Sequence, residues 1–452
     1  MAVSVGFISL GCAKNLVDSQ LMAGYLRAGK ILLAPAPEVA DIILINTCAF
    51  IDAAREEAAE NILAACAHKR QGRCQAVIVA GCMVARYRDK LEKVFPDVDA
   101  FVGVDDLERI AEIVEAVAAG KRCGVVVSNR ALPSKLYNPI YPELRFTGET
   151  YAYLKVAEGC DHRCAYCAIP QIRGPFRSRP MKDLLTETRA LLKSGVREIN
   201  LIAQDILRYG CDLTKNGRSK LPVLLRKIDA LEGDFRFRLL YGYPSAVTDE
   251  LLEVLATARH ACRYLDLPIQ HSHPDILRAM NRPAAVEATA GLAERLRKAI
   301  PDIVLRTTCL VGFPGETPTH FRHLMAYVRQ ARFDHLGVFV FSPEEGTPAA
   351  EMPDRPTLRT AESRRDKLMA LQQRIVKEKQ AALRGTADTV LLLAKKGKRW
   401  IGRLPRQAPD VDGVTRITGV PDTARPGDFI PVTLTGARGY DLLAAARTAG
   451  GK

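Results

Sequence analysis

Residues 158–167 read EGCDHRCAYC and directly follow an apolar run, Tyr153–Ala157, that predicts a β-strand. The stretch holds three cysteines, Cys160, Cys164 and Cys167. Three thiolates on one short loop can wrap one side of a cubane iron–sulfur cluster. Because three cysteines cannot ligate four irons, one iron would keep an open position for a substrate or cofactor. A zinc site is the alternative, since structural zinc takes a fourth ligand and His162 lies inside the loop.

The loop belongs to a long segment, residues 149–383, in which apolar runs alternate with helical patterns such as Met181–Ser194. Six runs have the character of strands: Tyr153–Ala157, Glu198–Ala203, Arg236–Tyr241, Tyr264–Pro268, Val304–Val311 and Leu336–Phe341. Six strand–helix units of this kind predict a partly closed barrel or a long parallel sheet. A charged helix over Thr357–Leu383 ends the segment, and its apolar stripe predicts one buried face.

The preceding segment, residues 1–127, also alternates strands and helices, which predicts an α/β domain with parallel strands. The expected strands are Val3–Leu10, Asp41–Asn46, Val77–Ala80 and Phe101–Val104. Lone cysteines follow the ends of the first three strands: Cys12, Cys48 and Cys82. Because ligands bind outside the carboxyl ends of parallel strands, these thiols predict a second metal or cluster site with an open iron. The alternative is that they are small buried side chains, and the remaining six cysteines are expected in packing or surface roles.

A proline-containing stretch and a glycine-rich stretch lie outside the two α/β segments. Residues 128–148 predict a linker, because three prolines break any helix there: Pro133, Pro139 and Pro142. Residues 384–452 predict a small all-β barrel of the OB type from three short strand patterns: Thr389–Leu393, Trp400–Leu404 and Phe429–Leu434. A helical pattern appears in this segment only from Leu442 onward.

The composition excludes a wholly disordered chain, because 452 residues at 48% hydrophobic content suffice for several cores. No apolar run is long enough to span a membrane, and the apolar start lacks the basic flank and cleavage site of a signal peptide. We therefore expect a cytoplasmic protein with no membrane partner. In a reducing cytosol, 12 cysteines favour metal binding or catalysis over disulfides. The net charge of +14 permits contact with RNA or the ribosome without requiring it.

The spacing of the cysteine loop resembles that of the radical S-adenosylmethionine enzymes. Together with the second three-cysteine pattern and the C-terminal barrel, it makes nearly the whole chain similar to the methylthiotransferase family of these enzymes. The resemblance implies a central radical-SAM partial (β/α)6 barrel and a C-terminal TRAM module. It also implies two [4Fe-4S] clusters, one on Cys12, Cys48 and Cys82 and one on Cys160, Cys164 and Cys167. In this family the N-terminal cluster carries sulfur, and S-adenosyl-L-methionine serves both as methyl donor and as the source of a 5′-deoxyadenosyl radical. The outcome is a C–H bond converted to C–S–CH3.

The resemblance also assigns four positions to the cofactor: Tyr166, Gln204, Gly312 and Glu316. Tyr166 matches the family's aromatic position near the adenine, and Gln204 ends the second central strand, where a polar contact is expected. Gly312 and Glu316 belong to TTCLVGFPGE, residues 307–316, which resembles the family's glycine-rich stretch on the fifth strand. A turn around Pro314 is the plainer interpretation of these glycines.

Two stretches resemble the branch of the family that modifies a protein: LGCAKNLVDS, residues 10–19, and NTCAFID, residues 46–52. That branch acts on the β-carbon of an aspartate in protein S-twelve of the small ribosomal subunit, and the radical chemistry requires a reducing electron donor. The branch that modifies an adenosine in tRNA is the alternative. A third hypothesis is a non-catalytic iron–sulfur or RNA-binding protein, which would leave the adenine-facing stretch and the large central segment unexplained.

Charged residues outside the cysteine motifs give weaker indications. Asp410 and Asp412 lie in one loop whose acidity would suit a basic ribosomal protein, so we predict substrate contacts there, with an ordinary solvated turn as the alternative. Arg173, Arg177 and Arg179 follow the cysteine loop and could steer the substrate or the cofactor carboxylate. Solvated surface arginines are the default expectation for these three.

Overall fold

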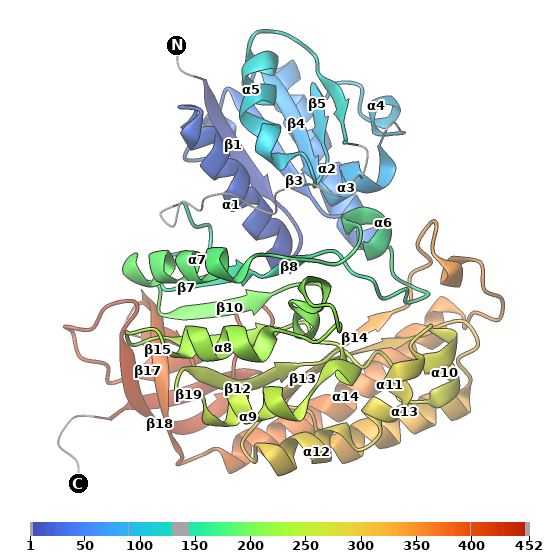
Figure 1. Cartoon of the computed structure of the whole chain (residues 1–452), viewed down its shortest axis with the longest axis vertical. Helices are drawn as coiled ribbons and strands as arrows, with labels where there is room; N and C mark the ends of the chain where they lie inside the picture. The colour runs from blue at the N-terminus through green and yellow to red at the C-terminus, as the bar shows by residue number, and fades with distance from the viewer. Residues whose placement is uncertain (1–2, 89, 129–143, 398, 448–452) are drawn as a thin grey trace.

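The computed structural model describes residues 3–88, 90–128, 144–397 and 399–447. Figure 1 shows three parts in chain order: an N-terminal parallel sheet with its helices, a central parallel sheet with its helices, and a small closed barrel beside the central sheet. The expected α/β class with a C-terminal all-β barrel is therefore confirmed. Most of the expected linker over residues 128–148 lies outside the described residues.

The N-terminal sheet has parallel strands in the order β2-β1-β3-β4-β5-β6. These strands are β1 Ser4–Ser9, β2 Leu32–Leu33, β3 Ile42–Thr47, β4 Ala76–Gly81, β5 Ala100–Val102 and β6 Gly124–Val126. The larger helices are α1 Ala13–Ala28, α2 Asp52–Arg70, α3 Cys82–Tyr87, α4 Lys90–Val94 and α5 Ile110–Ala118. One face of the sheet packs against α1 and α5 through Met22 and Ile110, and the other against α2 through Ile62. Because both faces are covered, every residue of β3 and β4 is buried.

Three neighbouring N-terminal strands end at nearly the same level. β1 pairs in parallel with β3, with Ser9 opposite Asn46, and β3 pairs with β4, with Thr47 opposite Gly81. The loops that follow β1, β3 and β4 therefore leave the same edge of the sheet side by side. This is the edge at which the sequence places Cys12, Cys48 and Cys82.

The central sheet has six parallel strands in the order β14-β13-β12-β11-β10-β7. These strands are β7 Tyr151–Lys155, β10 Glu198–Ile202, β11 Arg236–Leu240, β12 Ala261–Asp266, β13 Val304–Val311 and β14 His335–Val340. The main helices between them are α7 Met181–Lys193, α8 Leu221–Asp229, α9 Asp249–Thr257, α10 Pro274–Ala279, α11 Pro283–Thr289, α12 Leu292–Ala299 and α13 Pro318–Ala331. β7 and β14 remain as edges, so the barrel is open, and the expected partial (β/α)6 barrel is confirmed.

The two faces of the central sheet differ because successive strand residues point to opposite sides. Leu154, Leu201 and Leu239 point toward the surrounding helices and form the largest apolar core of the chain. The opposite face carries polar and aromatic side chains such as Arg238 and Tyr264, and parts of the other two domains contact it. This second face is thus lined by side chains that can form hydrogen bonds and ion pairs.

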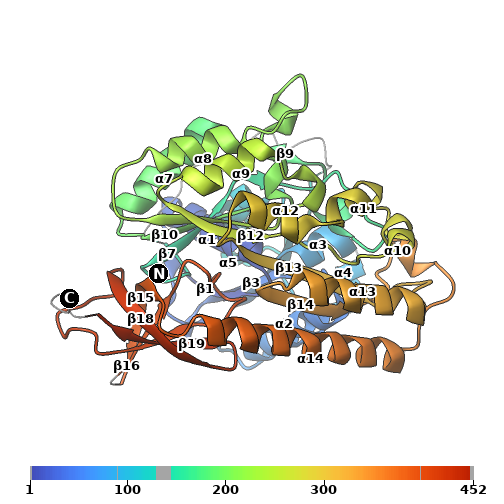
Figure 2. The same ribbon diagram turned by 90° about the horizontal axis from the view of Figure 1, so that it is seen from below.

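A long helix, α14 Leu358–Ala382, leads from the central sheet to the C-terminal barrel, as Figure 2 shows from below. Leu368, Leu371 and Ile375 form its buried stripe, as the sequence predicts. Within the described ranges no helix, α14 included, combines the length and the apolar character that a membrane crossing requires.

The C-terminal barrel is closed, with strand order β15-β16-β17-β19-β18. Its strands are β15 Ala387–Lys396, β16 Arg399–Arg403, β17 Thr415–Thr418, β18 Phe429–Arg438 and β19 Asp441–Ala446. The helical pattern expected from Leu442 is wrong, because this segment is strand β19. Leu442 and Ala444 alternate into the barrel core while β19 bonds to both β17 and β18. Closure of the barrel thus overrides the helical preference of an alanine-rich run.

Candidate active site

The first three-cysteine site lies in the loop that follows the first central strand. A short strand β8, Ala157–Glu158, pairs with β9, Arg177–Ser178, and the cysteine loop and helix α6, Ile169–Arg173, lie between them. The Cys160 amide donates to the carbonyl of Gly174 at 3.1 Å, and the Cys167 amide donates to that of Cys164 at 3.0 Å. Local hydrogen bonds therefore hold Cys160, Cys164 and Cys167 on one compact turn, and we call this the loop site.

Burial opposes ionisation of two loop-site thiols, Cys160 and Cys167. The pKa of each is raised to about 12, chiefly by burial and to a smaller extent by negative charge on a neighbouring cysteine. Arg282 is almost fully buried, and its guanidinium lies 3.6 Å from the Cys164 sulfur. Buried thiols such as Cys160 and Cys167, which resist ionisation on their own, are donors that a metal centre would stabilise, because metal binding replaces their protons. The loop site therefore fits a cluster.

His162 has partners other than a metal. Its Nε2 lies 2.8 Å from the Asp205 carboxylate, and its ring stacks on Tyr243 with the centroids 4.0 Å apart. The zinc alternative needed His162 as a fourth ligand. These contacts favour the three-cysteine interpretation of the loop.

The second three-cysteine site lies at the carboxyl ends of β1, β3 and β4, and we call it the edge site. Cys12 caps the start of α1, Cys48 follows β3, and Cys82 is the first residue of α3. Gly11 has φ +88°, and a Cβ placed on it would lie 3.2 Å from the Cys48 sulfur, so the loops approach closely. The structure thus brings together the three cysteines that lie far apart in sequence.

Two cations give the edge site a different electrostatic character. Loss of water around the Cys12 thiol raises its pKa, although the side chain still reaches solvent, but the charges of Lys14 and Arg173 outweigh this and lower the pKa. Burial raises the pKa of Cys82 to about 12, and Arg173 donates a hydrogen bond to its sulfur at 3.1 Å. Donors and positive charge beside thiolates are the surroundings in which a cluster sulfur is stabilised.

A buried ion network joins the two sites. Arg173 donates to Asp18 at 2.7 Å and to Glu158 at 3.1 Å, while it also contacts the sulfur of Cys82. Lys155 pairs with the same two carboxylates and is completely buried. Asp18 belongs to the N-terminal helix α1, and the other charged members belong to the segment around the loop site. The network therefore fixes the two cysteine sites relative to each other across the domain boundary.

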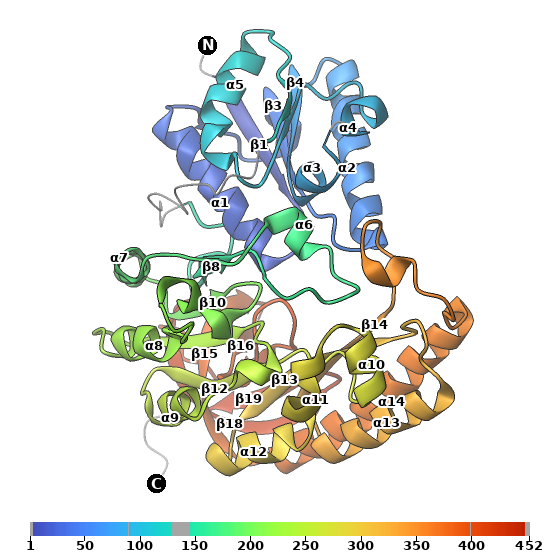
Figure 3. The ribbon, with the colours of Figure 1, turned by 45° about the vertical axis from the view of Figure 1, so that its right-hand side comes forward.

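The default expectation for the three arginines after the loop is wrong, because Arg173, Arg177 and Arg179 are all buried. Arg177 reaches Asp105 at 3.3 Å, and Arg179 reaches Glu187 at 2.7 Å. The segment from the loop through β9 lies between the N-terminal and central parts, where α6 packs on α3, as Figure 3 shows. Carboxylates from both parts pair with these arginines.

Sequence reasoning missed Lys155 and Asp18, although a signal for Lys155 exists. It is a single charged residue inside an otherwise apolar strand, and such a charge has to be paired when the strand is buried. Asp18 lies in the quoted LGCAKNLVDS stretch, but its partners Lys155 and Arg173 lie far away in the sequence, so only the fold could reveal its role.

Tyr166 lies in the cysteine loop and Gln204 contacts the residue that ends β8 before it, while Gly312 and Glu316 follow the end of β13. Tyr166 lies 3.4 Å from Arg282, and the Gln204 amide donates to Glu158 at 2.6 Å. Glu316 accepts from the backbone amide of Gly312, which has φ +77°. Among the described residues, one side-chain oxygen each of Gln204 and Glu316 is buried and lacks a hydrogen-bond partner. Such oxygens are polar groups that a bound ligand with donors could satisfy.

The acidic loop of the C-terminal barrel is bound by the central sheet. Asp412 is buried and accepts from Tyr264 at 2.8 Å and pairs with Arg306 at 2.7 Å. Asp410 lies at the surface with φ +66°, and it accepts from Tyr153 at 2.7 Å. These contacts dock the barrel on the central sheet, so the substrate contacts expected for Asp410 and Asp412 remain a prediction.

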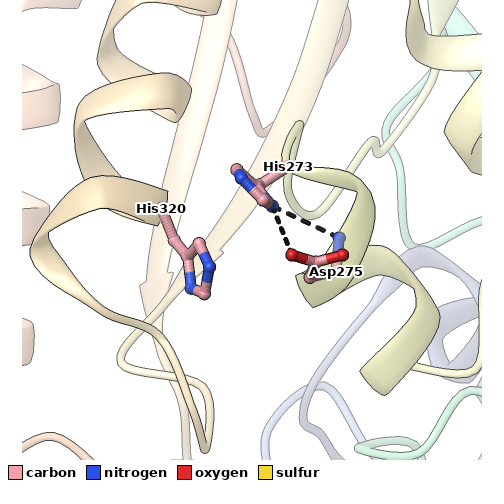
Figure 4. Close-up of side chains that lie close together, drawn as sticks. All are labelled: His273, Asp275 and His320. Atoms are coloured by element: carbon pink, nitrogen blue, oxygen red, sulfur yellow. Dashed lines mark hydrogen bonds and ion pairs between the residues drawn. The ribbon is translucent and has the colours of Figure 1, made fainter.

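A separate group of possible metal ligands lies on the helical side of the central domain. Figure 4 shows His273, Asp275 and His320 with their ligand atoms near one another. The Nδ1 of His273 accepts the Asp275 amide at 3.2 Å and caps α10, while the Nδ1 of His320 accepts the Thr317 amide at 3.2 Å in the capping box of α13. Helix capping accounts for both rings, so we assign the group to fold stability.

The other six cysteines have the packing and surface positions expected for them. Cys66, Cys74, Cys262 and Cys309 are buried, and Cys123 and Cys211 are partly exposed. None of the twelve cysteines, all of which lie in the described ranges, forms a disulfide.

Comparison with known proteins identifies the family. The uncharacterized protein family UPF0004 matches residues 4–103, the radical SAM superfamily matches residues 154–328, and the TRAM domain matches residues 385–446. A protein of Syntrophus aciditrophicus (strain SB) named ribosomal protein uS12 methylthiotransferase RimO is 44% identical over 447 residues, which cover 98% of each chain. A protein of the same name from Symbiobacterium thermophilum is 43% identical over 98% of this chain and 91% of its own. The chain belongs to the RimO family.

Membership of the RimO family confirms the predicted radical S-adenosylmethionine methylthiotransferase. Solved structures share the fold at low identity. The radical S-adenosylmethionine methyltransferase TsrM from Kitasatospora setae, with cobalamin and a [4Fe-4S] cluster bound, has a TM-score of 0.55 at 15% identity and covers 77% of this chain and 74% of its own. Its complex with tryptophan and aza-SAM has a TM-score of 0.56 at 15% identity, over 86% and 78% of the two chains. These RimO-family and fold matches agree with the three-part architecture.

Proposed function

We propose that this protein attaches a methylthio group to the β-carbon of an aspartate in ribosomal protein uS12. The observation that carries the proposal is the pair of three-cysteine sites joined by one buried ion network. Full-length similarity to proteins named for that activity supports the substrate assignment. An electron carrier would need only one of the two sites and no large open sheet beside them.

The residues that would hold the cofactors follow from the geometry. Cys160, Cys164 and Cys167 would bind one [4Fe-4S] cluster, and Cys12, Cys48 and Cys82 would bind the other. Once loaded, the loop-site cluster and S-adenosyl-L-methionine would supply the radical, and the edge-site cluster with a further S-adenosyl-L-methionine would supply the methylated sulfur. Tyr166, Gln204, Gly312 and Glu316 would bind the cofactor beside the loop site.

This chain's own residues would orient these groups and exclude water. Arg173 would stabilise the ligand sulfur of Cys82 by donating to it, and its salt bridges with Asp18 and Glu158 would keep the two sites in register. The free oxygen of Gln204 faces no donor of the described protein and would accept one from a bound cofactor. Burial of the network would keep solvent from the space between the sites.

The proposed partners extend beyond uS12. A reducing electron donor would be required for radical formation, and the exposed basic residues of β15 and β16, Lys395, Lys396 and Arg399, could contact ribosomal RNA if the substrate is the assembled subunit. Asp410 at the surface could meet a basic segment of uS12. Because ribosomes are assembled in the cytoplasm, we propose that the protein acts there.

Deletion of the gene followed by mass spectrometry tests the proposal. We expect uS12 to lose the mass of one methylthio group, and tRNA nucleosides to be unchanged. Re-expression of the wild-type chain should restore the modification, and the Cys48→Ala variant should not. A loss confined to tRNA would overturn the substrate assignment while leaving the chemistry in place.

A further inference from the structure

We propose that the ammonium group of Lys14 binds the side-chain carboxylate of the target aspartate and thereby selects an acidic residue for methylthiolation. The inference rests on the proposed function and adds a substrate-binding residue to it. Lys14 lies two residues after Cys12, at the start of α1, so a carboxylate bound there would lie beside the edge site.

The first turn of α1 reaches the polar face of the central sheet. Ala13, Leu16 and Val17 pack against a cluster that includes Tyr153 and Tyr264 of the central strands. Lys14 belongs to this same turn, and its ammonium lies 3.3 Å from the centroid of the Tyr241 ring. The side chain therefore extends from the N-terminal domain onto the sheet face where the substrate has to bind.

Lys14 differs from the other cations of this region because, among the described residues, it lacks a carboxylate salt bridge. Lys155 and Arg173 share the carboxylates of Asp18 and Glu158, and Arg306 pairs with Asp412. Within the described parts of the chain, Lys14 forms no ion pair with any carboxylate and contacts an aromatic face instead. An ammonium that faces an aromatic ring and no carboxylate can take an incoming anion as its salt-bridge partner.

Asp266 is close enough to act on Lys14 electrostatically, but it forms no salt bridge with the ammonium. Its carboxylate accepts the backbone amide of Tyr241 at 3.1 Å and faces Arg306 at 3.8 Å. The interaction with Tyr241 positions the aromatic ring rather than neutralising Lys14. The ammonium thus remains available to an anion from outside the chain.

Tyr241, whose ring contacts Lys14, has an unusual backbone conformation. It is a non-glycine residue with φ +68°, held by the hydrogen bond to Asp266 and by donation from the Ile206 amide to its carbonyl at 3.0 Å. Two residues on, Tyr243 stacks on His162 of the loop site. One strained turn therefore contacts Lys14 near the edge site and His162 at the loop site, which places Lys14 between the source of sulfur and the source of the radical.

The chemistry of this position favours a carboxylate ligand. In an aspartate the carboxylate is bonded directly to the β-carbon that would be modified, so a salt bridge to Lys14 would fix the reacting carbon relative to both sites. An asparagine at the same position would leave the ammonium unpaired and bind more weakly. Selection of an acidic residue would then follow from one charge.

A double-mutant cycle on the cluster-loaded, full-length protein tests the proposal. The probes are a synthetic peptide covering the modified loop of uS12 and the same peptide with asparagine in place of the target aspartate. Peptide affinity is measured by fluorescence anisotropy under anaerobic conditions for the wild type, Lys14→Met and Lys14→Arg. Lys182→Met, an exposed lysine on the outer helix α7, is the matched control.

We expect Lys14→Met to weaken binding of the aspartate peptide by about tenfold or more, because one hydrogen-bonded charge pair is lost. The asparagine peptide should bind the wild type as weakly, and Lys14→Met should not weaken it further. Lys14→Arg should retain most of the discrimination, and Lys182→Met should match the wild type. Iron and sulfide content should be the same in all four proteins.

Three outcomes would overturn the proposal. Lys14→Met could bind both peptides like the wild type, it could weaken both peptides equally, or it could lose edge-site iron, which would assign Lys14 to the cluster. Methylthiolation of the aspartate peptide by the wild type is scored separately. A wild type that leaves this peptide unmodified while releasing 5′-deoxyadenosine would refute the proposed function and not the lysine alone.

Discussion

The loop site and the edge site each present three thiols, but the two sites are assembled in opposite ways. The loop site takes Cys160, Cys164 and Cys167 from one turn, and local hydrogen bonds hold it. The edge site takes Cys12, Cys48 and Cys82 from three loops, and the register of β1, β3 and β4 holds it. A defect in one loop would damage the first site alone, whereas the second site depends on the whole N-terminal sheet.

Their electrostatic surroundings differ as well. At the loop site burial dominates and raises the pKa of Cys160 and Cys167 to about 12. At the edge site Lys14 and Arg173 lower the pKa of Cys12. A site surrounded by cations suits sulfur that must carry negative charge before it is methylated, while a desolvated site suits a reaction that must exclude water.

The largest effect is expected from removing one cysteine from each site. Cys164→Ala should abolish release of 5′-deoxyadenosine, and Cys48→Ala should preserve some release but abolish methylthiolation. Each variant should lose about half of the bound iron, since each site would hold one of two similar clusters. Iron assay and chromatography of the nucleoside measure both quantities. Cys66→Ala, which removes a packing thiol of the same N-terminal core, should retain all of the iron. Normal methylthiolation by Cys48→Ala would show that the edge site is not the sulfur source.

The second largest effect is expected from Arg173→Met, which removes a member of the ion network that joins the two sites. Asp18 and Glu158 would each lose a buried cationic partner, which costs about 3–5 kcal/mol in unfolding free energy. Chemical denaturation measures the loss. Arg263→Met, at an exposed ion pair with Asp302, should cost less than about 1 kcal/mol. Equal stability of the two variants would mean that the buried network does not join the domains.

A smaller and more local effect is expected from Gly81→Ala. Gly81 has φ +100°, and a Cβ there would overlap the Asn46 side chain and lie 2.7 Å from the Thr47 carbonyl. The backbone would have to shift at the residue before Cys82, so edge-site iron should fall while loop-site iron remains. Gly195→Ala is the matched control, because φ is +94° and no atom lies near its Cβ. Each should cost about 1–2 kcal/mol for the left-handed backbone, with a further loss only at Gly81. Loss of iron from both sites in Gly81→Ala would contradict the independence of the two sites.

The smallest effect is a change in the pH dependence of stability at Asp266, which positions Tyr241 between the sites. Burial raises the pKa of Asp266 to about 6, above its value near 3.9 in an unfolded chain. The folded protein therefore binds the proton more tightly, and this contribution to stability is lost as pH rises from about 4 through 6. A shift of this size corresponds to at most about 3 kcal/mol.

Asp266→Asn should flatten that dependence. Denaturation of the wild type and the variant between about pH 4 and 7 measures the difference in slope. Asp302→Asn, an exposed carboxylate of the same domain, should leave the slope unchanged. Parallel curves for the wild type and Asp266→Asn would show that Asp266 titrates normally.

The sequence predicts those features that depend on neighbouring residues. The loop site could be predicted because its three cysteines lie on one turn, and the two parallel sheets could be predicted from the alternation of apolar runs with helical patterns. The edge site could also be predicted, because the carboxyl ends of parallel strands share an edge whatever the loop lengths.

Features that join distant segments escaped prediction. Burial of Arg173 depends on Asp18 and Glu158, which come from different parts of the chain and are only brought together by docking of the N-terminal domain. The contacts of Asp412 with Tyr264 and Arg306 likewise depend on where the C-terminal barrel docks. Strand β19 was missed because an alanine-rich run favours a helix locally, while closure of the barrel decides its state.

Helix α1 carries its functional residues at a fixed angular spacing. Cys12, Asn15 and Asp18 recur every three residues, so the thiol, the amide that contacts Cys82 and the carboxylate that contacts Arg173 share one side of the helix. An insertion of one residue after Cys12 would rotate everything beyond it by about 100°. Insertions and deletions in this turn should therefore be far more damaging than substitutions, and a library of length variants would separate the two effects. The length of this turn therefore determines which side of α1 each of these residues occupies.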